Sequence, residues 1–236
     1  MPSAFNLHFM QRLIGSFIFL LALVSTSLAS EHVILTGGTA LRKWENYRVE
    51  GDRHDKWWAN FVRASTLQMD ILKAQEGGNP SFTWYVYKKS YELRGREDGK
   101  PYTTWITEQA QKRGAQLVWI HSGDDFIQQF NKLPLGGTRT FNYFGHSNKH
   151  CFLFDYSSQI LGVSAAWLHE SELENLSSRP FAKKATCKSW GCYTGESMNR
   201  FWKKATGTRL IGAKGKTDYT ALSFGKMPTV NGRWVR

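Results

Sequence analysis

A cysteine and a histidine stand at the ends of two segments that have the composition of buried strands. Cys192 follows the run 185–190 and His146 follows the run 138–144, in each case after one intervening glycine. A cysteine thiolate is a strong nucleophile, and a nearby imidazole can take up the thiol proton. Because the carboxyl ends of parallel strands share one edge of a sheet, adjacent strands would bring these side chains together across a cleft. The pair therefore predicts nucleophilic catalysis by a thiol–imidazole dyad.

The turns that follow the two strands would supply backbone donors for this chemistry. An oxyanion needs N–H groups at about 2.7–3.1 Å, and we expect those of Cys192 and of Ser147 or Gly145 to provide them. The active-site turns contain three glycines, Gly145, Gly191 and Gly195. The first two would let a substrate backbone approach closely, because they carry no side chain. A helix predicted over 196–205 would add a favourable dipole and free N–H groups beside the cysteine.

Both segments resemble the motifs of a known family. Residues 141–147, Phe-Asn-Tyr-Phe-Gly-His-Ser, resemble the strand and Gly-His-Gly turn of caspase-fold cysteine peptidases, especially the gingipain-like and CHAT-like groups. Residues 190–195, Trp-Gly-Cys-Tyr-Thr-Gly, resemble their second motif, a strand followed by a small residue, Cys, any residue, Thr or Ser, and Gly. The resemblance covers residues 116–215. It implies a caspase/haemoglobinase-like fold and a catalytic dyad of His146 and Cys192 that acts on peptide bonds.

One position departs from the family pattern. The family has glycine directly after the histidine, where this chain has Ser147. Serine keeps the N–H group, but it has fewer backbone conformations than glycine and its side chain occupies space in the cleft. We therefore hold two hypotheses: an exported cysteine peptidase that works through a thioacyl intermediate, and a catalytically inactive caspase-fold module that binds a partner.

Acidic side chains near the predicted cleft could select a basic substrate residue. The candidates are Asp155, Glu196 and Asp218. Each of them also fits a structural role as a capping or surface residue. The potential metal ligands His146, His150 and Cys151 do not lie in a helix-like stretch that would place two imidazoles on one face. We expect neither a metal nor a cofactor.

The chain is strongly basic, with 236 residues and a formal net charge of +12. The basic residues are spread along the sequence, and no nucleic-acid-binding signature is present, so we expect a solvated basic surface and no nucleic-acid partner. The expected partner is a peptide or protein substrate. A basic secreted protein that binds polyanions is the further alternative that the charge leaves open.

The N-terminus has the pattern of a secretory signal peptide. Arg12 precedes an apolar run over 13–24 and small residues over 25–30, which predicts cleavage after Ala29. The apolar run is shorter than the roughly 20 residues of a membrane span, so no stable span is expected after cleavage, and an uncleaved anchor is the alternative. We expect a signal peptide at 1–29 and a single exported domain at 30–236, periplasmic or extracellular.

Export makes the pairing of the three cysteines relevant. Cys151 and Cys187 lie on segments that read as neighbouring strands, so a disulfide between them would leave Cys192 as a free thiol. A disulfide between Cys187 and Cys192 is the alternative, and it would remove the nucleophile.

Strands and helices are predicted to alternate along the chain. Strands are expected at 32–38, 82–87, 116–120, 138–144, 151–154, 185–190 and 209–213. Helices are expected at 55–75, 103–113, 164–176 and 196–205, with a short one capped by Ser122 or Asp124 and running to Asn131. Residues 94–100 are expected to form a charged loop. The tail 214–236 is irregular, and its aromatic residues Tyr219 and Trp234 either line a substrate pocket or pack back on the sheet. The pattern predicts a three-layer α/β sandwich with a mainly parallel central sheet.

Overall fold

The computed structural model describes residues 31–47, 49–50, 53, 56–77, 80–155 and 166–236. The predicted signal peptide, residues 1–29, lies outside this part of the chain. The strands of the described residues are β1 (Glu31–Thr36), β2 (Ser81–Tyr87), β3 (Gln116–Ile120), β4 (Thr138–Phe144), β5 (His146–Ser147), β6 (Cys151–Asp155), β7 (Ala166–His169), β8 (Phe181–Ser189), β9 (Leu210–Asp218) and β10 (Thr229–Val235). The helices are α2 (Arg42–Tyr47), α3 (Asn60–Glu76), α4 (Lys88–Asp98), α5 (Tyr102–Arg113), α6 (Gly123–Phe130) and α7 (Met198–Thr206), with 3-10 turns η2 (Glu172–Asn175) and η3 (Thr220–Phe224). None of the helices in these ranges is long and apolar enough to cross a membrane.

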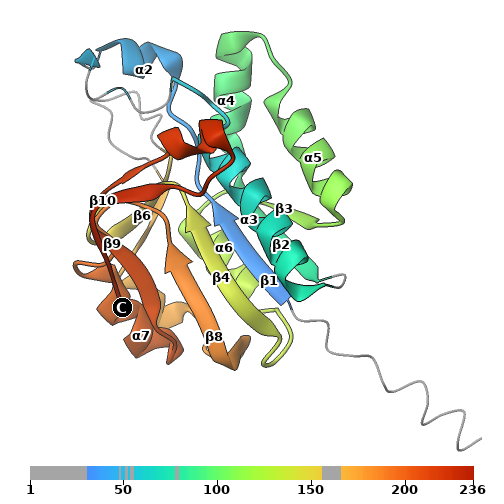
Figure 1. The fold of residues 1–236 in the computed structure, drawn as a ribbon, viewed down its shortest axis with the longest axis vertical. Helices are drawn as coiled ribbons and strands as arrows, with labels where there is room; N and C mark the ends of the chain where they lie inside the picture. Colours follow the sequence, from blue (N-terminus) through green and yellow to red (C-terminus); the bar gives the residue numbers. More distant parts are fainter. Residues whose placement is uncertain (1–30, 48, 51–52, 54–55, 78–79, 156–165) are drawn as a thin grey trace, which may run out of the picture.

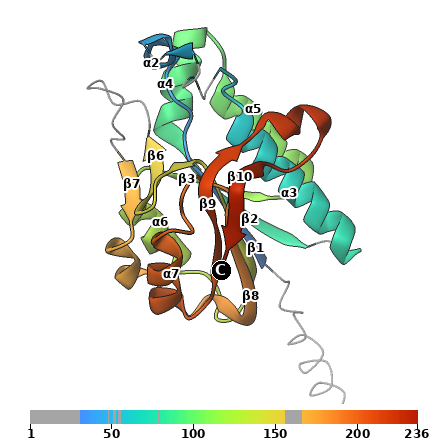
Figure 2. The same cartoon turned by 60° about the vertical axis from the view of Figure 1, so that its left-hand side comes forward.

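The main sheet has seven strands in the order β10-β9-β8-β4-β1-β2-β3. Every neighbouring pair is parallel except β9 and β10, which run antiparallel. Helices lie on both faces of the sheet (Figures 1 and 2). The prediction of an α/β fold with a mainly parallel central sheet is therefore confirmed, and the arrangement is compatible with a three-layer sandwich. A second, antiparallel sheet contains β5, β6 and β7.

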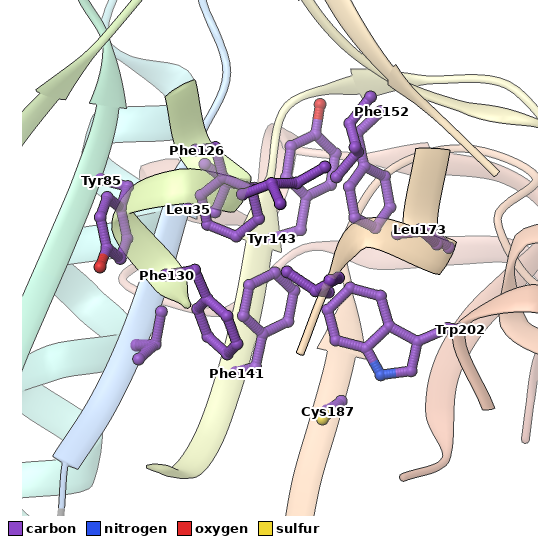
Figure 3. Packing of buried hydrophobic residues seen from close by; sticks show 14 of the residues in the cluster. Leu35, Tyr85, Phe126, Phe130, Phe141, Tyr143, Phe152, Leu173, Cys187 and Trp202 are labelled. Carbon is purple, nitrogen blue, oxygen red and sulfur yellow. The ribbon is translucent and has the colours of Figure 1, made fainter. Parts of the chain in front are cut away.

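Alternate residues of the central strands feed two separate cores, because successive side chains of a strand point to opposite faces. Val33 and Leu35 of β1 belong to the core under α6 and α7, whereas Ile34 belongs to the core under α3 and α5. In the first of these cores, the ring of Phe141 lies 4.6 Å from that of Trp202 on α7 (Figure 3). The central strands are thus buried on both sides, as expected for a parallel sheet.

Two helices end at a glycine, and a third begins at a serine that caps it, at the positions expected from the sequence. Gly114 ends α5 with φ 66°, and Gly207 ends α7 with φ 72°, both in the left-handed region that glycine adopts readily. At the start of α6 the Ser122 hydroxyl accepts the Asp125 N–H over 3.0 Å. Of the two predicted caps, Ser122 is therefore the one used.

The predicted helix over 164–176 is wrong for the residues described there. Residues 166–169 form β7 and pair with β6, and a 3-10 turn follows. Trp167 is 44% exposed, whereas Leu168 is fully buried. This alternation is typical of a strand, and pairing with β6 overrides the local helical spacing. Two other predicted helices begin later than expected: α3 starts at Asn60, while Asp55 lies outside the described residues, and α7 starts at Met198.

The predicted charged loop at 94–100 is also wrong, because α4 continues to Asp98. The Arg94 side chain is 1% exposed and donates to Asp98 over 2.8 Å and to the Ala40 carbonyl over 2.7 Å. Burial alone would raise the pKa of the Asp98 carboxyl, but hydrogen bonds from Arg42, Arg94 and Tyr102 outweigh it and hold that pKa well below its usual range. Arg94 and Asp98 of this stretch are thus internal partners of one another.

Replacing Asp98 by asparagine should destabilise the fold strongly, because it removes the carboxylate that is hydrogen-bonded to the buried Arg94 guanidinium and leaves the Glu97 carboxylate at 3.9 Å. We expect Asp98→Asn to lower the free energy of unfolding by about 3 kcal/mol near neutral pH, measured by urea denaturation. The lowered pKa means that the carboxylate stabilises the fold above about pH 4 and that this contribution is lost as the pH falls below that value. The difference between wild type and variant should therefore shrink in acid.

The matched control is Asp70→Asn, which removes a carboxylate from an exposed pair. Asp70 is 51% exposed and accepts from Arg113 over 2.9 Å. Loss of this surface pair should cost less than about 1 kcal/mol. Equal losses in the two variants would contradict the role assigned to the buried pair.

The C-terminal tail packs against the sheet, which was one of the two predicted outcomes. β10 returns along β9, from Thr229 opposite Asp218 to Val235 opposite Gly212. Next to this pair the Lys188 ammonium of β8 lies 3.4 Å from the Trp190 ring centroid and 4.0 Å from that of Trp234 on β10. Burial lowers the pKa of Lys188 to about 8, while the two indole faces favour the charged form.

The pH dependence of stability tests which of these two effects is larger. With a pKa of about 8 for Lys188 in the fold and about 10.4 in the unfolded chain, the unfolded chain binds more protons between these values, so stability rises with pH there. We therefore expect the free energy of unfolding of the wild type, relative to Lys188→Met, to increase from about pH 8 to about pH 10. A decrease over this interval would mean that the indole rings outweigh burial.

Candidate functional site

The ends of β4 and β8 form the candidate site, because these strands are parallel neighbours in the sheet. The adjacency that the proposed dyad requires is therefore present. Beyond β4 the chain passes through Gly145 into His146 and Ser147, and beyond β8 it turns at Gly191 to reach Cys192. The Ser147 hydroxyl donates to the Cys192 carbonyl oxygen over 2.7 Å. This bond ties the histidine-bearing segment to the cysteine-bearing turn.

The glycines of both turns are required by the protein's own packing. A Cβ at Gly191 would collide with the Ser147 side chain, and a Cβ at Gly145 would collide with the Tyr143 hydroxyl. At Gly195 a Cβ would come within 2.6 Å of the Gly212 carbonyl oxygen. These contacts give Gly145 and Gly191 a packing role in the protein itself, and the approach of a substrate backbone to them stays a prediction.

The sulfur of Cys192 is half-buried and held by a residue that the sequence analysis did not identify. The Thr217 N–H donates to the sulfur over 3.3 Å, and the Thr217 hydroxyl lies 3.3 Å from it. Thr217 belongs to β9, in the stretch expected to be an irregular tail. Only the long-range pairing of β9 with β8 and β10 brings it here, so no local sequence signal marks it.

The residue after the cysteine has a strained backbone. Tyr193 has φ 62°, and it is the one residue other than glycine with a positive φ in the described ranges. Its N–H donates to the Gly215 carbonyl over 2.9 Å, which holds the turn against β9. Bulky residues adopt this conformation at a cost of order 1 kcal/mol, and such strain is concentrated at functional sites.

Some backbone N–H groups around Cys192 donate to a protein carbonyl, and others have no such acceptor and could bind an oxyanion. The Cys192 N–H has no hydrogen-bond acceptor within the part of the chain that is described. On the other strand end, Asn148 donates to the Cys151 carbonyl over 3.1 Å. Because bonded and non-bonded pairs alternate along an antiparallel ladder, the N–H of the preceding residue, Ser147, points away from β6. Both predicted oxyanion donors are thus compatible with that role.

The prediction that the following helix adds a dipole and free N–H groups beside the cysteine is wrong. α7 begins only at Met198, and the N–H groups at its start donate to protein carbonyls. Met198 donates to Lys149 over 2.9 Å and Asn199 donates to Thr194 over 3.1 Å. These groups are neither free nor next to the cysteine.

The half-buried His146 lies beside a pair of aromatic side chains, Phe61 and Tyr219. Its ring is edge-on to that of Phe61, with centroids 4.9 Å apart, and Phe61 is in turn 5.2 Å from the ring of Tyr219. The Tyr219 hydroxyl donates to the Trp190 carbonyl over 3.0 Å, which links the Phe61 and Tyr219 rings to the end of β8. The sequence analysis named Tyr219 as a possible pocket residue and missed Phe61, which carries no signal beyond its place on a helix.

A buried tyrosine supports the backbone beneath the histidine. The Tyr143 hydroxyl donates to the His146 carbonyl over 2.6 Å. Burial raises the pKa of Tyr143 well above its usual value, so this hydroxyl keeps its proton and remains a donor. The backbone position of His146 thus depends on the packing of Tyr143 in the core under α6 and α7.

All three cysteines are free thiols. Cys187 lies on β8, but Cys151 lies on β6 of the second sheet, so the prediction that they occupy neighbouring strands is wrong. Burial raises the pKa of Cys187 to about 11. Burial, together with Glu172 and Glu170, also raises the pKa of Cys151 to about 11. These two thiols are poor nucleophiles near neutral pH.

The three predicted acids do not gather at one place. Asp155 is buried and accepts the Tyr87 hydroxyl over 3.3 Å, at the end of β2. Glu196 is exposed in the turn before α7. Asp218 follows Thr217 on β9, and the Thr220 hydrogen bonds to its carboxylate lower its pKa. In the described part of the chain, no group of three or more His, Cys, Asp or Glu side chains could hold a metal ion.

No family model, curated protein or solved structure matches this chain. The resemblance to caspase-fold peptidases therefore remains an expectation from the two motifs. What the structure adds is the contact of the two strand ends, the Thr217 contacts to the sulfur and the strained turn at Tyr193.

A double-mutant cycle tests whether the two turns pack as described. Gly191→Ala should lower the free energy of unfolding by about 2 kcal/mol, because the new methyl group displaces the Ser147 hydroxyl. The backbone of Gly191 is not in the left-handed region, so the cost is steric. In a Ser147→Gly background the same change should cost less than half as much, measured by thermal or urea unfolding. Strictly additive costs would contradict the contact.

Proposed function

We propose that this chain is an exported cysteine peptidase of the caspase-fold type, with Cys192 as nucleophile and His146 as acid and base. The observation that carries the proposal is the position of Cys192. It stands in a strained turn at the carboxyl end of β8, bonded through its own carbonyl to the segment that bears His146. In parallel sheets, reactive groups gather at this edge.

The proposed reaction needs only groups that lie at this edge. His146 takes the thiol proton, and the Cys192 thiolate adds to the peptide carbonyl carbon. The N–H groups of Cys192 and Ser147 stabilise the negative oxygen that forms. The imidazolium then gives its proton to the leaving amine as the C–N bond breaks, which leaves a thioacyl enzyme. Water, deprotonated by His146, hydrolyses this thioester and restores the thiol.

The serine that replaces the family's glycine is compatible with this reaction. Ser147 has no positive φ, so the torsional freedom of glycine is not used at this position. Its hydroxyl is engaged with the Cys192 carbonyl, which leaves the backbone N–H as the group available to an oxyanion. The serine thus acts as a tie between the two turns.

The most suitable of the three acids for substrate selection is Asp218. It is exposed and directly follows Thr217, whose N–H contacts the Cys192 sulfur. A carboxylate at this point would favour substrates with a lysine or arginine near the cleaved bond. Asp155 is buried against Tyr87 and is less suited to this role.

Selective modification of Cys192 is the first test. A thiol-reactive peptide probe should label Cys192, mapped by mass spectrometry of the digested protein, and leave Cys151 and Cys187 unlabelled because burial raises the pKa of both to about 11. Labelling should be lost in Cys192→Ala and retained in Cys151→Ala. Labelling of Cys151 in preference to Cys192 would contradict the assignment.

Hydrolysis of a diverse peptide library by the folded chain is the second part of this test. We expect cleavage rates to fall at least about 1,000-fold in Cys192→Ala and about 100-fold in His146→Ala. A folded wild-type protein that binds peptides and cleaves none would instead support the inactive binding module. Cleavage that persists in Cys192→Ala would rule out this nucleophile.

A further inference from the structure

The turn that carries Cys192 runs antiparallel beside β9, beyond the end of β8. The Tyr193 N–H donates to the Gly215 carbonyl over 2.9 Å. Two residues further along the turn, the Gly195 N–H donates to the Ala213 carbonyl over 2.9 Å. The contacts thus move forward by two residues in the turn while they move back by two in β9, which is the pattern of an antiparallel ladder.

At the next step of this ladder, the sulfur of Cys192 takes the place of a backbone acceptor. Thr217 is two residues beyond Gly215 on β9, and its N–H donates to the sulfur over 3.3 Å. In a regular ladder this N–H would donate to a carbonyl oxygen of the facing segment. Thr217 also lies opposite Val230 of β10, so the sheet fixes the direction of its N–H. A donor held in this direction favours negative charge on the sulfur.

The Thr217 hydroxyl is a second group on the same sulfur, at 3.3 Å. A hydroxyl both donates and accepts, so it can accept the S–H of the neutral thiol and, after rotation of its own O–H, donate to the thiolate. The backbone N–H can only donate. In the part of the chain that the structure describes, no other residue hydrogen-bonds to the Cys192 sulfur.

We propose that Thr217 is a further catalytic residue, which stabilises the thiolate of Cys192 through its backbone N–H and its hydroxyl. A donor forms a stronger hydrogen bond to an ionised acceptor than to a neutral one, so the thiolate gains more from both groups than the thiol does. The inference rests on the proposed function for the nucleophilic role of Cys192. It divides the activation between two residues: His146 takes the thiol proton, and Thr217 stabilises the charge that remains on the sulfur.

The other ionisable groups at this edge do not supply these donors. The hydroxyls of Tyr143 and Tyr219 each donate to a backbone carbonyl. Burial, more than the neighbouring ionisable side chains, raises the pKa of Tyr143 well above its usual value, so it stays protonated. Lys216 and Asp218 flank Thr217 in the chain, and both are exposed, so water screens their charges. Their charges are also opposite in sign.

The test is the rate at which iodoacetamide alkylates Cys192 in the full chain, from about pH 5.5 to about pH 10. The thiolate displaces iodide as the S–C bond forms, and mass spectrometry of the digested protein measures the Cys192 product separately from those of the other two cysteines. Thr217→Val removes the hydroxyl and keeps the backbone N–H and the shape of the side chain.

Thr217→Val should shift the pH profile of this reaction. We expect the pH at which the rate is half its maximum to rise by about one unit, and the rate at about pH 6.5 to fall about three- to tenfold. At about pH 10 thiols ionise without this stabilisation, and a more basic thiolate is the stronger nucleophile. The rate of the variant should therefore equal or exceed that of the wild type there.

Three further variants control for packing. Thr217→Ser keeps the hydroxyl and should stay within about twofold of the wild-type rate at every pH. Thr217→Ala also lacks the hydroxyl but has a smaller side chain, and it should show the same upward shift as Thr217→Val. Thr229→Val makes the same chemical change at an exposed position of β10, opposite Asp218, and should leave the profile unchanged.

Two results would overturn the proposal. One is a Thr217→Val rate that equals the wild-type rate at about pH 6.5, or that is lower by the same factor at about pH 6.5 and at about pH 10, because a uniform loss reports access to the sulfur and not its ionisation. The other is a Thr217→Ser profile that shifts as far as that of Thr217→Val. Alkylation needs no peptidase activity. The predicted shift without peptide cleavage would count against the proposed function alone, and cleavage without the shift would count against the role of Thr217 alone.

Discussion

The hydrogen bond from the Ser147 hydroxyl to the Cys192 carbonyl joins the two segments on which the proposed chemistry depends. It forms only because β4 and β8 are adjacent and end at the same edge of the sheet. The absence of a side chain at Gly191 leaves space for the serine. The Tyr143 hydroxyl holds the backbone carbonyl of His146, and the Thr217 N–H holds the sulfur of Cys192. A small set of close contacts thus defines the geometry of the site.

Charge has two different roles in this chain. In α4 the buried Arg94 is neutralised by Asp98 and stabilises the fold. On and beside α7, by contrast, Arg200, Lys203 and Arg209 are exposed, and none of them has a carboxylate partner among the described residues. A net charge of +12 does not distinguish these roles. Position and pairing decide whether a basic residue supports the structure from within or lies on its solvated surface.

The strands of the fold could be predicted where a run of buried residues ends at a glycine. The predictions that failed did so for physical reasons. The strands that precede Gly145 and Gly191 were recognisable because β-branched and aromatic runs end at residues that allow a sharp turn. The helix expected over 164–176 failed because residues 166–169 pair with β6 as a strand, which buries Leu168 and leaves Trp167 exposed. Thr217 reaches the sulfur only through the pairing of β9 with its neighbours, which no local pattern encodes. His146 and Cys192 could be singled out by type and position, but their supporting residues could not.

The central claim is that His146 and Cys192 act on one substrate carbonyl. A crystal structure of the full chain after covalent reaction with a peptide-based thiol probe tests it directly. The account predicts an adduct on Cys192, a ring nitrogen of His146 within about 4 Å of the sulfur or of the leaving-group position, and the carbonyl oxygen of the probe at about 3 Å from the N–H groups of Cys192 and Ser147. An adduct in which the His146 ring remains against Phe61, with neither nitrogen within about 6 Å of the sulfur or of the leaving-group position, would contradict it.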